Sequence, residues 1–307
     1  MEMVETGILG IQITTTLMNI KELLAKVRKI ELRSRDISRQ LFHGDTLSFF
    51  KGRGMSFSEV REYQYSDDIR FIDWNVTART GIPFVKLYEE EHELNVVLLV
   101  DISQSTYFGT DQKLKSEVIA EISAVLALAA IQSNNKVGLI LFSDRIEHFI
   151  PPGKGRNQIL RIIRQLVDPQ PQNKATNLPI ALQFLNNVVK KNSICFLISD
   201  FMDENFTESI RIAGRKHDLI AICLDDKAER QLPNVGLMYA VDPEDGRTYE
   251  VDTSDPFSQK MYASKYTERI SRLRKVLAES KVDLIQVDTD EKEDYIRKLI
   301  RFFKSRK

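Results

Sequence analysis

Oxygen-bearing side chains stand at the ends of two apolar segments and in a loop between them. Asp101 ends the run LNVVLLVD, Ser103 and Ser105 follow at alternate positions, and Asp200 ends the run SICFLISD. Thr176 lies in the polar loop NKATN, which precedes a helical pattern. Hard divalent cations such as magnesium prefer oxygen ligands. These residues therefore predict a metal site with few anionic ligands and one position open to a carboxylate of a partner protein.

Two other interpretations of the same residues stay open. Asp and Ser are favoured helix caps, so Asp101 and Ser103 could simply cap the helix that follows. An aspartate at this place could also be the nucleophile of a magnesium-dependent phosphatase or hydrolase. That chemistry commonly needs a second carboxylate two residues on for acid–base catalysis, where this chain has Ser103. We therefore favour a site without enzymatic activity.

The secondary structure pattern indicates where these residues meet. Continuous runs of Val, Ile and Leu are typical of strands that are buried on both faces. Their alternation with helices predicts an α/β fold, a doubly wound and mostly parallel sheet with helices on both faces. Ligands bind such sheets at the carboxyl ends of the strands. The expected strands are 94–101, 136–143, 193–200, 218–225 and 282–289, and the expected helices are 113–133, 157–167, 178–190, 206–216, 256–280 and 291–304.

The chain divides into three parts. Residues 1–41 predict an N-terminal helical segment, and residues 42–93 have the glycines, aromatics and short mixed runs of a β-rich segment. The α/β domain covers 94–307 and is interrupted by a hairpin signal at about 233–255. We expect the hairpin and the β-rich segment to pack together as a small β-rich lobe.

The complete oxygen set resembles a known metal site. Asp101, Ser103, Ser105, Thr176 and Asp200 resemble the metal-ion-dependent adhesion site of von Willebrand factor type A domains. The strand order is similar too, with one short antiparallel strand after KVGLILFS. The resemblance implies a Rossmann-like von Willebrand A fold and a bound magnesium ion, with manganese or calcium as alternatives. Phe201 replaces the glycine that usually follows the last aspartate, so we expect a reshaped loop there.

Three segments further upstream resemble a bacterial family. The segments 52–63, 67–79 and 83–91 resemble blocks of domain-of-unknown-function family 58, the von Willebrand A-like proteins that accompany MoxR-type AAA+ ATPases. The motif residues among them are Arg53, Glu59, Arg61, Tyr63, Asp67, Asp68, Arg70, Asp73, Trp74 and Arg79. The resemblance implies a cytoplasmic adaptor for a MoxR-type ATPase that assists the assembly or maturation of client proteins.

Charged and apolar residues alternate in the segment 67–79. We expect its acids and arginines to form an internal ion-pair network that ties the small lobe to the α/β domain. We also expect Trp74, the single tryptophan, to lie in the core. The alternative is a surface that faces a partner, because arginine beside aromatic residues is common in protein interfaces.

Composition argues against several classes of function. The 44 Lys and Arg balance the 44 Asp and Glu among 307 residues, which argues against a nucleic-acid binder. The chain has no P-loop and no Gly-x-Gly-x-x-Gly after its first buried strand, which argues against direct nucleotide binding. Cys195 and Cys223 lie in apolar runs, as reduced buried thiols do. Without a long apolar run or a secretory leader, we expect a cytoplasmic protein with no membrane span, whose contact with membrane-bound partners would be peripheral.

Overall fold

The computed structural model describes residues 37, 52–65, 67–107, 114–169, 171, 175–203, 205–241, 247–289 and 294–306. At its centre is a six-stranded sheet with the order β10-β7-β6-β3-β4-β5. Neighbouring strands are parallel, except that β5 runs antiparallel to β4. The strands are β3 (Asn95–Asp101), β4 (Lys136–Phe142), β5 (Ile146–Gly153), β6 (Ile194–Ser199), β7 (Asp218–Asp225) and β10 (Asp283–Asp288). The expected mixed α/β fold with a mostly parallel sheet is confirmed.

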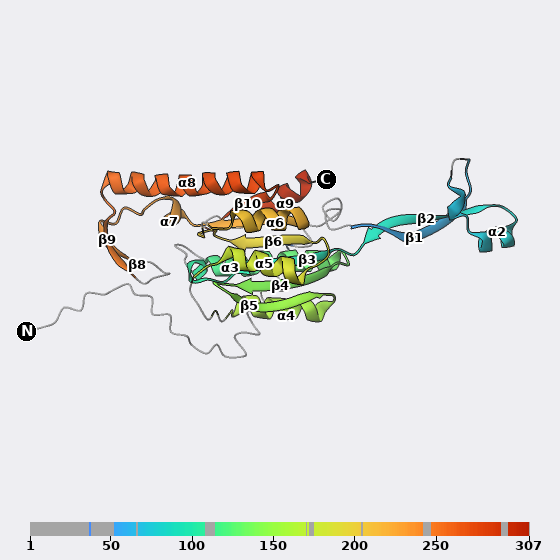
Figure 1. Ribbon diagram of the computed structural model, residues 1–307, viewed down its shortest axis with the longest axis horizontal. Helices are drawn as coiled ribbons and strands as arrows, with labels where there is room; N and C mark the ends of the chain where they lie inside the picture. Colours follow the sequence, from blue (N-terminus) through green and yellow to red (C-terminus); the bar gives the residue numbers. More distant parts are fainter. Residues whose placement is uncertain are drawn as a thin grey trace, which may run out of the picture.

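Helices cover both faces of this sheet (Figure 1). The helices α3 (Lys115–Gln132), α4 (Arg156–Val167) and α9 (Asp294–Ser305) pack on one face. The helices α5 (Leu178–Val188), α6 (Thr207–Lys216) and α8 (Pro256–Glu279) pack on the other. The sheet is therefore the middle layer of three, which explains why its strands are apolar at nearly every position.

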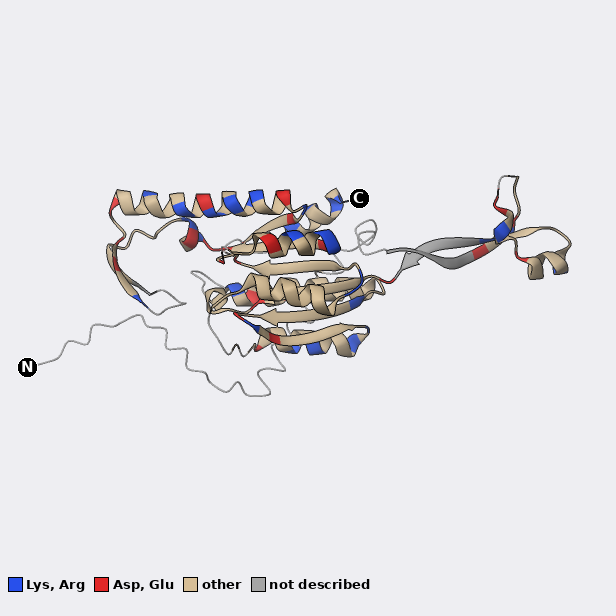
Figure 2. Ribbon diagram, in the orientation of Figure 1, with Lys and Arg blue, Asp and Glu red and all other residues tan. Residues whose placement is uncertain are grey.

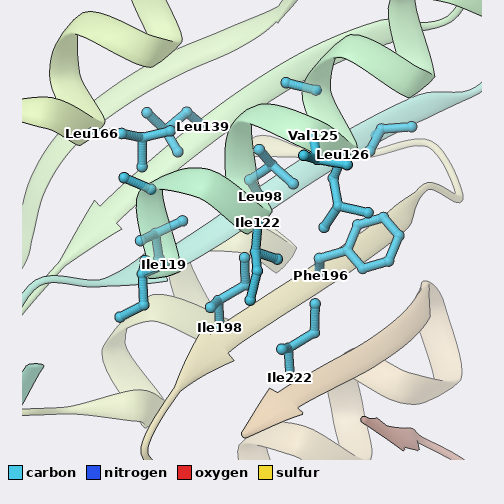
Figure 3. Packing of buried hydrophobic residues seen from close by; sticks show 14 of the residues in the cluster. Leu98, Ile119, Ile122, Val125, Leu126, Leu139, Leu166, Phe196, Ile198 and Ile222 are labelled. Atoms are coloured by element: carbon cyan, nitrogen blue, oxygen red, sulfur yellow. The ribbon is translucent and has the colours of Figure 1, made fainter. Parts of the chain in front are cut away.

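The alternation of side chains along β3 produces the two halves of the core. Leu98 belongs to the cluster under α3, while its neighbours Val97 and Leu99 belong to the cluster under α5, because successive strand residues point to opposite faces. Figure 3 shows Ile122 and Val125 of α3 close to Leu98. These two closely packed apolar layers hold the strand ends, and the loops that follow them, in fixed positions.

The strand order reverses next to β3. From β3 the chain continues to β4 and β5 on one side of the sheet, and it then crosses to β6, β7 and β10 on the other side. Loops after the carboxyl ends of β3 and β6 therefore leave in opposite directions. Ligand sites of open α/β sheets form at such a reversal, so this edge is the place to look for one.

The expected single β-rich lobe is wrong. In the described part of the chain, the strands β1 (Gly52–Glu62) and β2 (Phe84–His92) form one two-stranded sheet, and β8 (Leu237–Val241) and β9 (Thr248–Asp252) form another. Figure 1 shows β1 and β2 as an arm that projects from the start of β3, while β8 and β9 lie at the opposite end of the molecule. The turn residues of a hairpin predict that its two strands pair with each other. They do not predict where in the molecule the hairpin lies.

Some expectations fall outside the described residues. Of the N-terminal helical segment 1–41, only Ile37 is described, and it is helical and buried in the core. In the described ranges, no helix has both the length and the hydropathy that a membrane span requires. Cys195 and Cys223 are both free and buried, as expected.

Candidate functional site

Asp101 is the last residue of β3 and is fully buried. One carboxylate oxygen, Oδ1, accepts a hydrogen bond from the backbone N–H of Ser103 at 2.9 Å, and Oδ2 accepts one from the Ser199 hydroxyl at 2.7 Å. Burial, followed by the charge of Asp200, raises the pKa of Asp101 to about 7. Two acids thus lie close together where their charges are unfavourable, and a bound cation would reverse that penalty.

Ser103 and Ser105 belong to the turn after β3, which continues into the 3-10 helix η3 (Gln104–Tyr107). Their hydroxyl oxygens lie 3.0 Å apart. The turn is fixed by the Thr106 hydroxyl, which donates to the Ser103 carbonyl at 2.7 Å. The long helix α3 begins later, with Leu114 at its N-cap, so Asp101 and Ser103 do not cap that helix.

Thr176 lies in a loop that crosses the end of β3. The N–H of Asn177 donates to the Ser143 carbonyl, just after β4, at 2.9 Å. The N–H of Leu178 donates to Oδ2 of Asp203, in the loop after β6, at 3.0 Å. Because β3 lies between β4 and β6, this loop spans the edge where the first aspartate stands. The Thr176 hydroxyl is buried and has no hydrogen-bond partner among the described residues.

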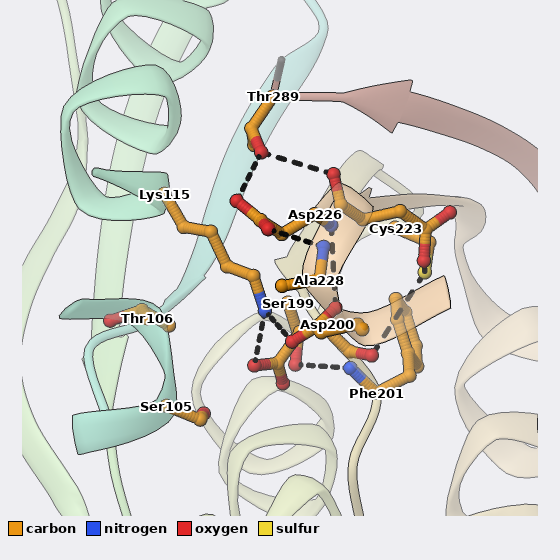
Figure 4. A network of polar contacts seen from close by, with 12 residues as sticks. Ser105, Thr106, Lys115, Ser199, Asp200, Phe201, Cys223, Asp226, Ala228 and Thr289 are labelled. Carbon is orange, nitrogen blue, oxygen red and sulfur yellow. Dashed lines mark hydrogen bonds and ion pairs between the residues drawn. The ribbon is translucent and has the colours of Figure 1, made fainter. Parts of the chain in front are cut away.

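Asp200 follows β6 and is also fully buried. Its Oδ2 lies 3.3 Å from the ammonium of Lys115, whereas its Oδ1 is buried without a hydrogen-bond partner in the described part of the chain. Lys115 also pairs with Glu229 of the short helix α7 (Lys227–Arg230). Figure 4 shows the Lys115 side chain reaching from α3 toward Asp200.

Phe201 follows Asp200 at the position where we expected the loop to be reshaped, and that expectation stays a prediction. Phe201 has φ of 54°, in the left-handed region that glycine adopts most easily. Its N–H donates to the Ser199 hydroxyl at 3.0 Å, and its ring packs edge-on against Phe206 with centroids 5.8 Å apart. Burial of the ring, which is 2% exposed, offsets the backbone strain.

Three further groups contact these acids and were not predicted from the sequence. Ser199 donates to Asp101, Lys115 contacts Asp200, and Arg269 of α8 donates to the Asp200 carbonyl at 2.7 Å. Ser199 could have been predicted from the sequence, since it immediately precedes Asp200 at a strand end. The lysine and the arginine had no comparable signal, because both stand on helices far away in the sequence.

The donor set is unusual for a metal site in having few charges. Among the described residues, no three His, Cys, Asp or Glu side chains come together as a metal-binding group. The candidate site offers two carboxylates, Asp101 and Asp200, and three hydroxyls. The Thr176 hydroxyl and Oδ1 of Asp200 are buried oxygens without partners, and such atoms are costly unless something binds them. The residues present therefore fit an oxygen-preferring divalent ion.

The motif residues of the second resemblance lie on the arm formed by β1, β2 and the helix α2 (Trp74–Thr80) between them. Figure 2 shows charged residues of both signs at the outer end of the arm. The described ion pairs of the segment 67–79 join residues of the arm to each other, so these pairs do not tie it to the α/β domain as expected. They are Arg61–Asp67 at 2.7 Å, Arg70–Asp68 at 2.6 Å and Lys86–Asp73 at 3.4 Å. Glu59 and Arg79 are exposed, Tyr63 donates its N–H to the Pro83 carbonyl, and the Arg53 side chain lies outside the described ones.

The expectation that Trp74 belongs to the core is wrong. Its side chain is 70% exposed, and α2 has no buried residue. The nearby Tyr65, Ile69 and Ile82 are exposed as well. We call these four residues the arm tip. These side chains lie outside the apolar clusters that pack on the central sheet.

Comparisons with solved structures give weak likenesses. The conserved hypothetical protein BatB from Bacteroides thetaiotaomicron aligns with 69% of this chain and 98% of its own, at 13% identity and a TM-score of 0.45. Proximal thread matrix protein 1 from the mussel byssus aligns with 43% of this chain and 38% of its own, at 17% identity and a TM-score of 0.34. Neither score is high enough to transfer a fold name.

Comparisons of sequence are more informative. The uncharacterized protein Rv1480 of Mycobacterium tuberculosis is 28% identical over 289 residues, which cover 93% of this chain and 90% of that protein. The uncharacterized protein MAV169 of Mycobacterium avium is 23% identical over 52% of this chain and 94% of its own length. The model of a family described as "Protein of unknown function DUF58" matches residues 59–272, more than half of the chain, and this chain belongs to that family.

Proposed function

We propose that the chain is a non-enzymatic, metal-dependent protein-interaction module of the von Willebrand A type. One observation supports this most directly. Three loops bring two carboxylates and three hydroxyls to the edge where the strand order reverses, and two of the oxygens there are buried without hydrogen-bond partners in the described structure. Binding of a cation by these oxygens would satisfy them and stabilise the adjacent acids.

The ion that best suits this donor set is magnesium, with manganese or calcium as alternatives. Asp101 and Asp200 would hold it directly or through water, and the hydroxyls of Ser103, Ser105 and Thr176 would complete its oxygen shell. When bound, the ion supplies a positive centre with a position left for a carboxylate. The chain's own contribution is to keep the oxygens fixed and water-poor, which strengthens their interaction with charge.

The arm tip is the second surface on which the proposal rests. Exposed Trp74, Tyr65 and Ile69 have the composition of residues that dominate protein interfaces, and single projecting aromatics bury well in a partner's pocket. The resemblance to MoxR-associated proteins suggests a MoxR-type AAA+ ATPase as one partner and its client as another. We propose that the metal site binds an acidic side chain of the ATPase and that the arm tip binds a second surface of the same ATPase.

The experiment is a capture assay with the purified MoxR-type ATPase. The full chain and its Asp101→Ala variant are immobilised in magnesium or in EDTA, and retained ATPase is measured. We expect retention only by the wild type in magnesium. Equal retention by Asp101→Ala would contradict the proposal, whereas Asp101-dependent turnover of a generic phosphate ester would favour the magnesium-dependent hydrolase instead.

A further inference from the structure

Lys115 is a fully buried lysine at the start of α3. Its ammonium contacts Oδ2 of Asp200 at 3.3 Å and also pairs with Glu229. These acids stand 85 and 114 residues further along the chain, after β6 and in α7 respectively. A lysine is almost never buried unless it is paired, so this position is held by its two acidic partners.

The ion pairs with Asp200 and Glu229 favour the charged form of Lys115 in this buried environment. Glu229 is itself fixed, because it forms a capping box with Asp226 at the start of α7. The chain has therefore placed a permanent cation against one of the two carboxylates of the candidate metal site.

We propose that Lys115 is a built-in competitor of the metal ion for Asp200, and that it keeps the ion weakly bound until a partner carboxylate arrives. This inference rests on the proposed metal site. The ammonium contacts Oδ2 of Asp200, whereas Oδ1 is buried without a hydrogen-bond partner among the described residues. An ion at Oδ1 would share one carboxylate with a positive charge, so each cation weakens the binding of the other.

The competition gives the site a way to couple ion and partner. A carboxylate from the partner adds a negative charge next to the ion and offsets the repulsion from Lys115. Ion and partner then increase each other's affinity by the same factor, as linkage requires. Glu229 acts in the opposite direction to Lys115, because it neutralises the ammonium and draws it away from Asp200. Lys115 and Glu229 are thus positioning residues that act on the ion through Asp200.

Two substitutions with opposite predicted signs test the proposal. Binding of Mn2+ to the full chain is followed by the loss of the free-ion paramagnetic resonance signal. Lys115→Met should bind Mn2+ about tenfold more tightly than the wild type, because one repelling charge is removed. Glu229→Gln should bind it several-fold more weakly, because the ammonium then opposes the ion without its second acid. Lys136→Met is the matched control, since Lys136 pairs with Glu93 at the opposite edge of the sheet, and its Mn2+ affinity should be unchanged.

Each outcome decides between the competitor role and a merely structural one. If Lys115 only holds the loops together, both variants bind Mn2+ more weakly, and that result overturns the proposal. If Lys115→Met does not fold, Lys115→Gln, which removes the charge but keeps a polar group near Asp200, decides in its place, and unchanged or weaker binding of Mn2+ overturns the proposal. Binding by Lys115→Met when the wild type shows none would support it strongly. If neither the wild type nor any variant binds Mn2+, the metal site itself fails, and this inference fails with it.

Discussion

The carboxyl edge of the central sheet and the arm of β1 and β2 differ in whether their charged residues are buried or exposed. At the sheet edge Asp101, Asp200 and Lys115 are fully buried, and several of their neighbours are buried hydroxyls. On the arm the ion pairs are at the surface and the exposed residues are apolar. Burying charge is costly, and pairs at the surface contribute little to stability. This contrast supports our proposal that the edge binds an ion and that the arm contacts a partner.

Removal of the buried cation should have the largest effect on stability. In metal-free buffer, Lys115→Met leaves Asp200 and Glu229 without their shared counter-charge, and we expect the free energy of unfolding to fall by about 3 kcal/mol. Urea denaturation measures this change. Lys136→Met, which breaks an exposed pair, should leave the stability nearly unchanged. Equal losses in both variants would contradict the distinction between buried and exposed charges.

A buried histidine at the opposite edge of the sheet gives the next largest effect. His217 is 3% exposed, neither ring nitrogen has a hydrogen-bond partner in the described structure, and burial lowers its pKa from 6.5 to about 4. Between these values the unfolded chain binds a proton that the folded chain does not. Stability is therefore lost as the pH falls from about 6.5 toward 4, by about 2 kcal/mol at pH 5.

Comparison of urea denaturation at pH 7 and pH 5 isolates this contribution. The wild type should lose about 2 kcal/mol more between these pH values than His217→Leu does. The same loss in both chains would show that His217 is not the group responsible.

Thr176→Val separates ion binding from stability. The Thr176 hydroxyl is buried without a hydrogen-bond partner among the described residues, so its replacement by a methyl group should not lower the free energy of unfolding without metal. Mn2+ affinity should nevertheless fall about tenfold, because one oxygen ligand is lost. Ser123→Ala removes a second unpartnered buried hydroxyl, which lies in α3, and should leave Mn2+ affinity unchanged. A Thr176→Val protein that binds Mn2+ normally would remove this residue from the site.

The smallest effect on stability is expected on the arm. Trp74→Ala should leave the melting temperature unchanged, since the side chain is mostly exposed, and should weaken retention of the ATPase in the capture assay. Ile212→Ala is a suitable control, because Ile212 is also an exposed apolar residue but lies on α6 of the α/β domain. A clear loss of stability in Trp74→Ala would show that the tip packs on the rest of the protein.

Local patterns predicted those parts of the molecule that depend on local rules. Val96 to Val100 read as a strand buried on both faces because every position is apolar, and the structure has β3 there. Asp101 and Asp200 were found because they end such runs, and parallel strands bring their ends to one edge. The loop with Thr176 could be assigned to the same edge because it precedes a helix between two strands.

Contacts between residues that are far apart in the sequence could not be predicted from these patterns. Lys115 and Glu229 look like ordinary charged residues of helices, and nothing in the spacing of residues 114 apart indicates that they pair. Trp74 was expected in the core because it is large and apolar, but burial requires a neighbouring layer, and α2 has no buried residue in the described structure. The spacing of apolar residues predicts which face of an element can be buried. Whether that face is buried depends on which elements the fold places next to it.

A thermal melt across a magnesium titration tests the central claim, that the sheet edge binds a divalent ion through Asp101. An ion that binds only the folded chain stabilises it by about 2.7 kcal/mol at a hundredfold excess over its dissociation constant. We predict that the melting temperature of the wild type rises by about 5 °C in that range and that the melting temperature of Asp101→Ala does not change. An equal rise in both chains, or no rise in either up to saturating magnesium, would contradict the account.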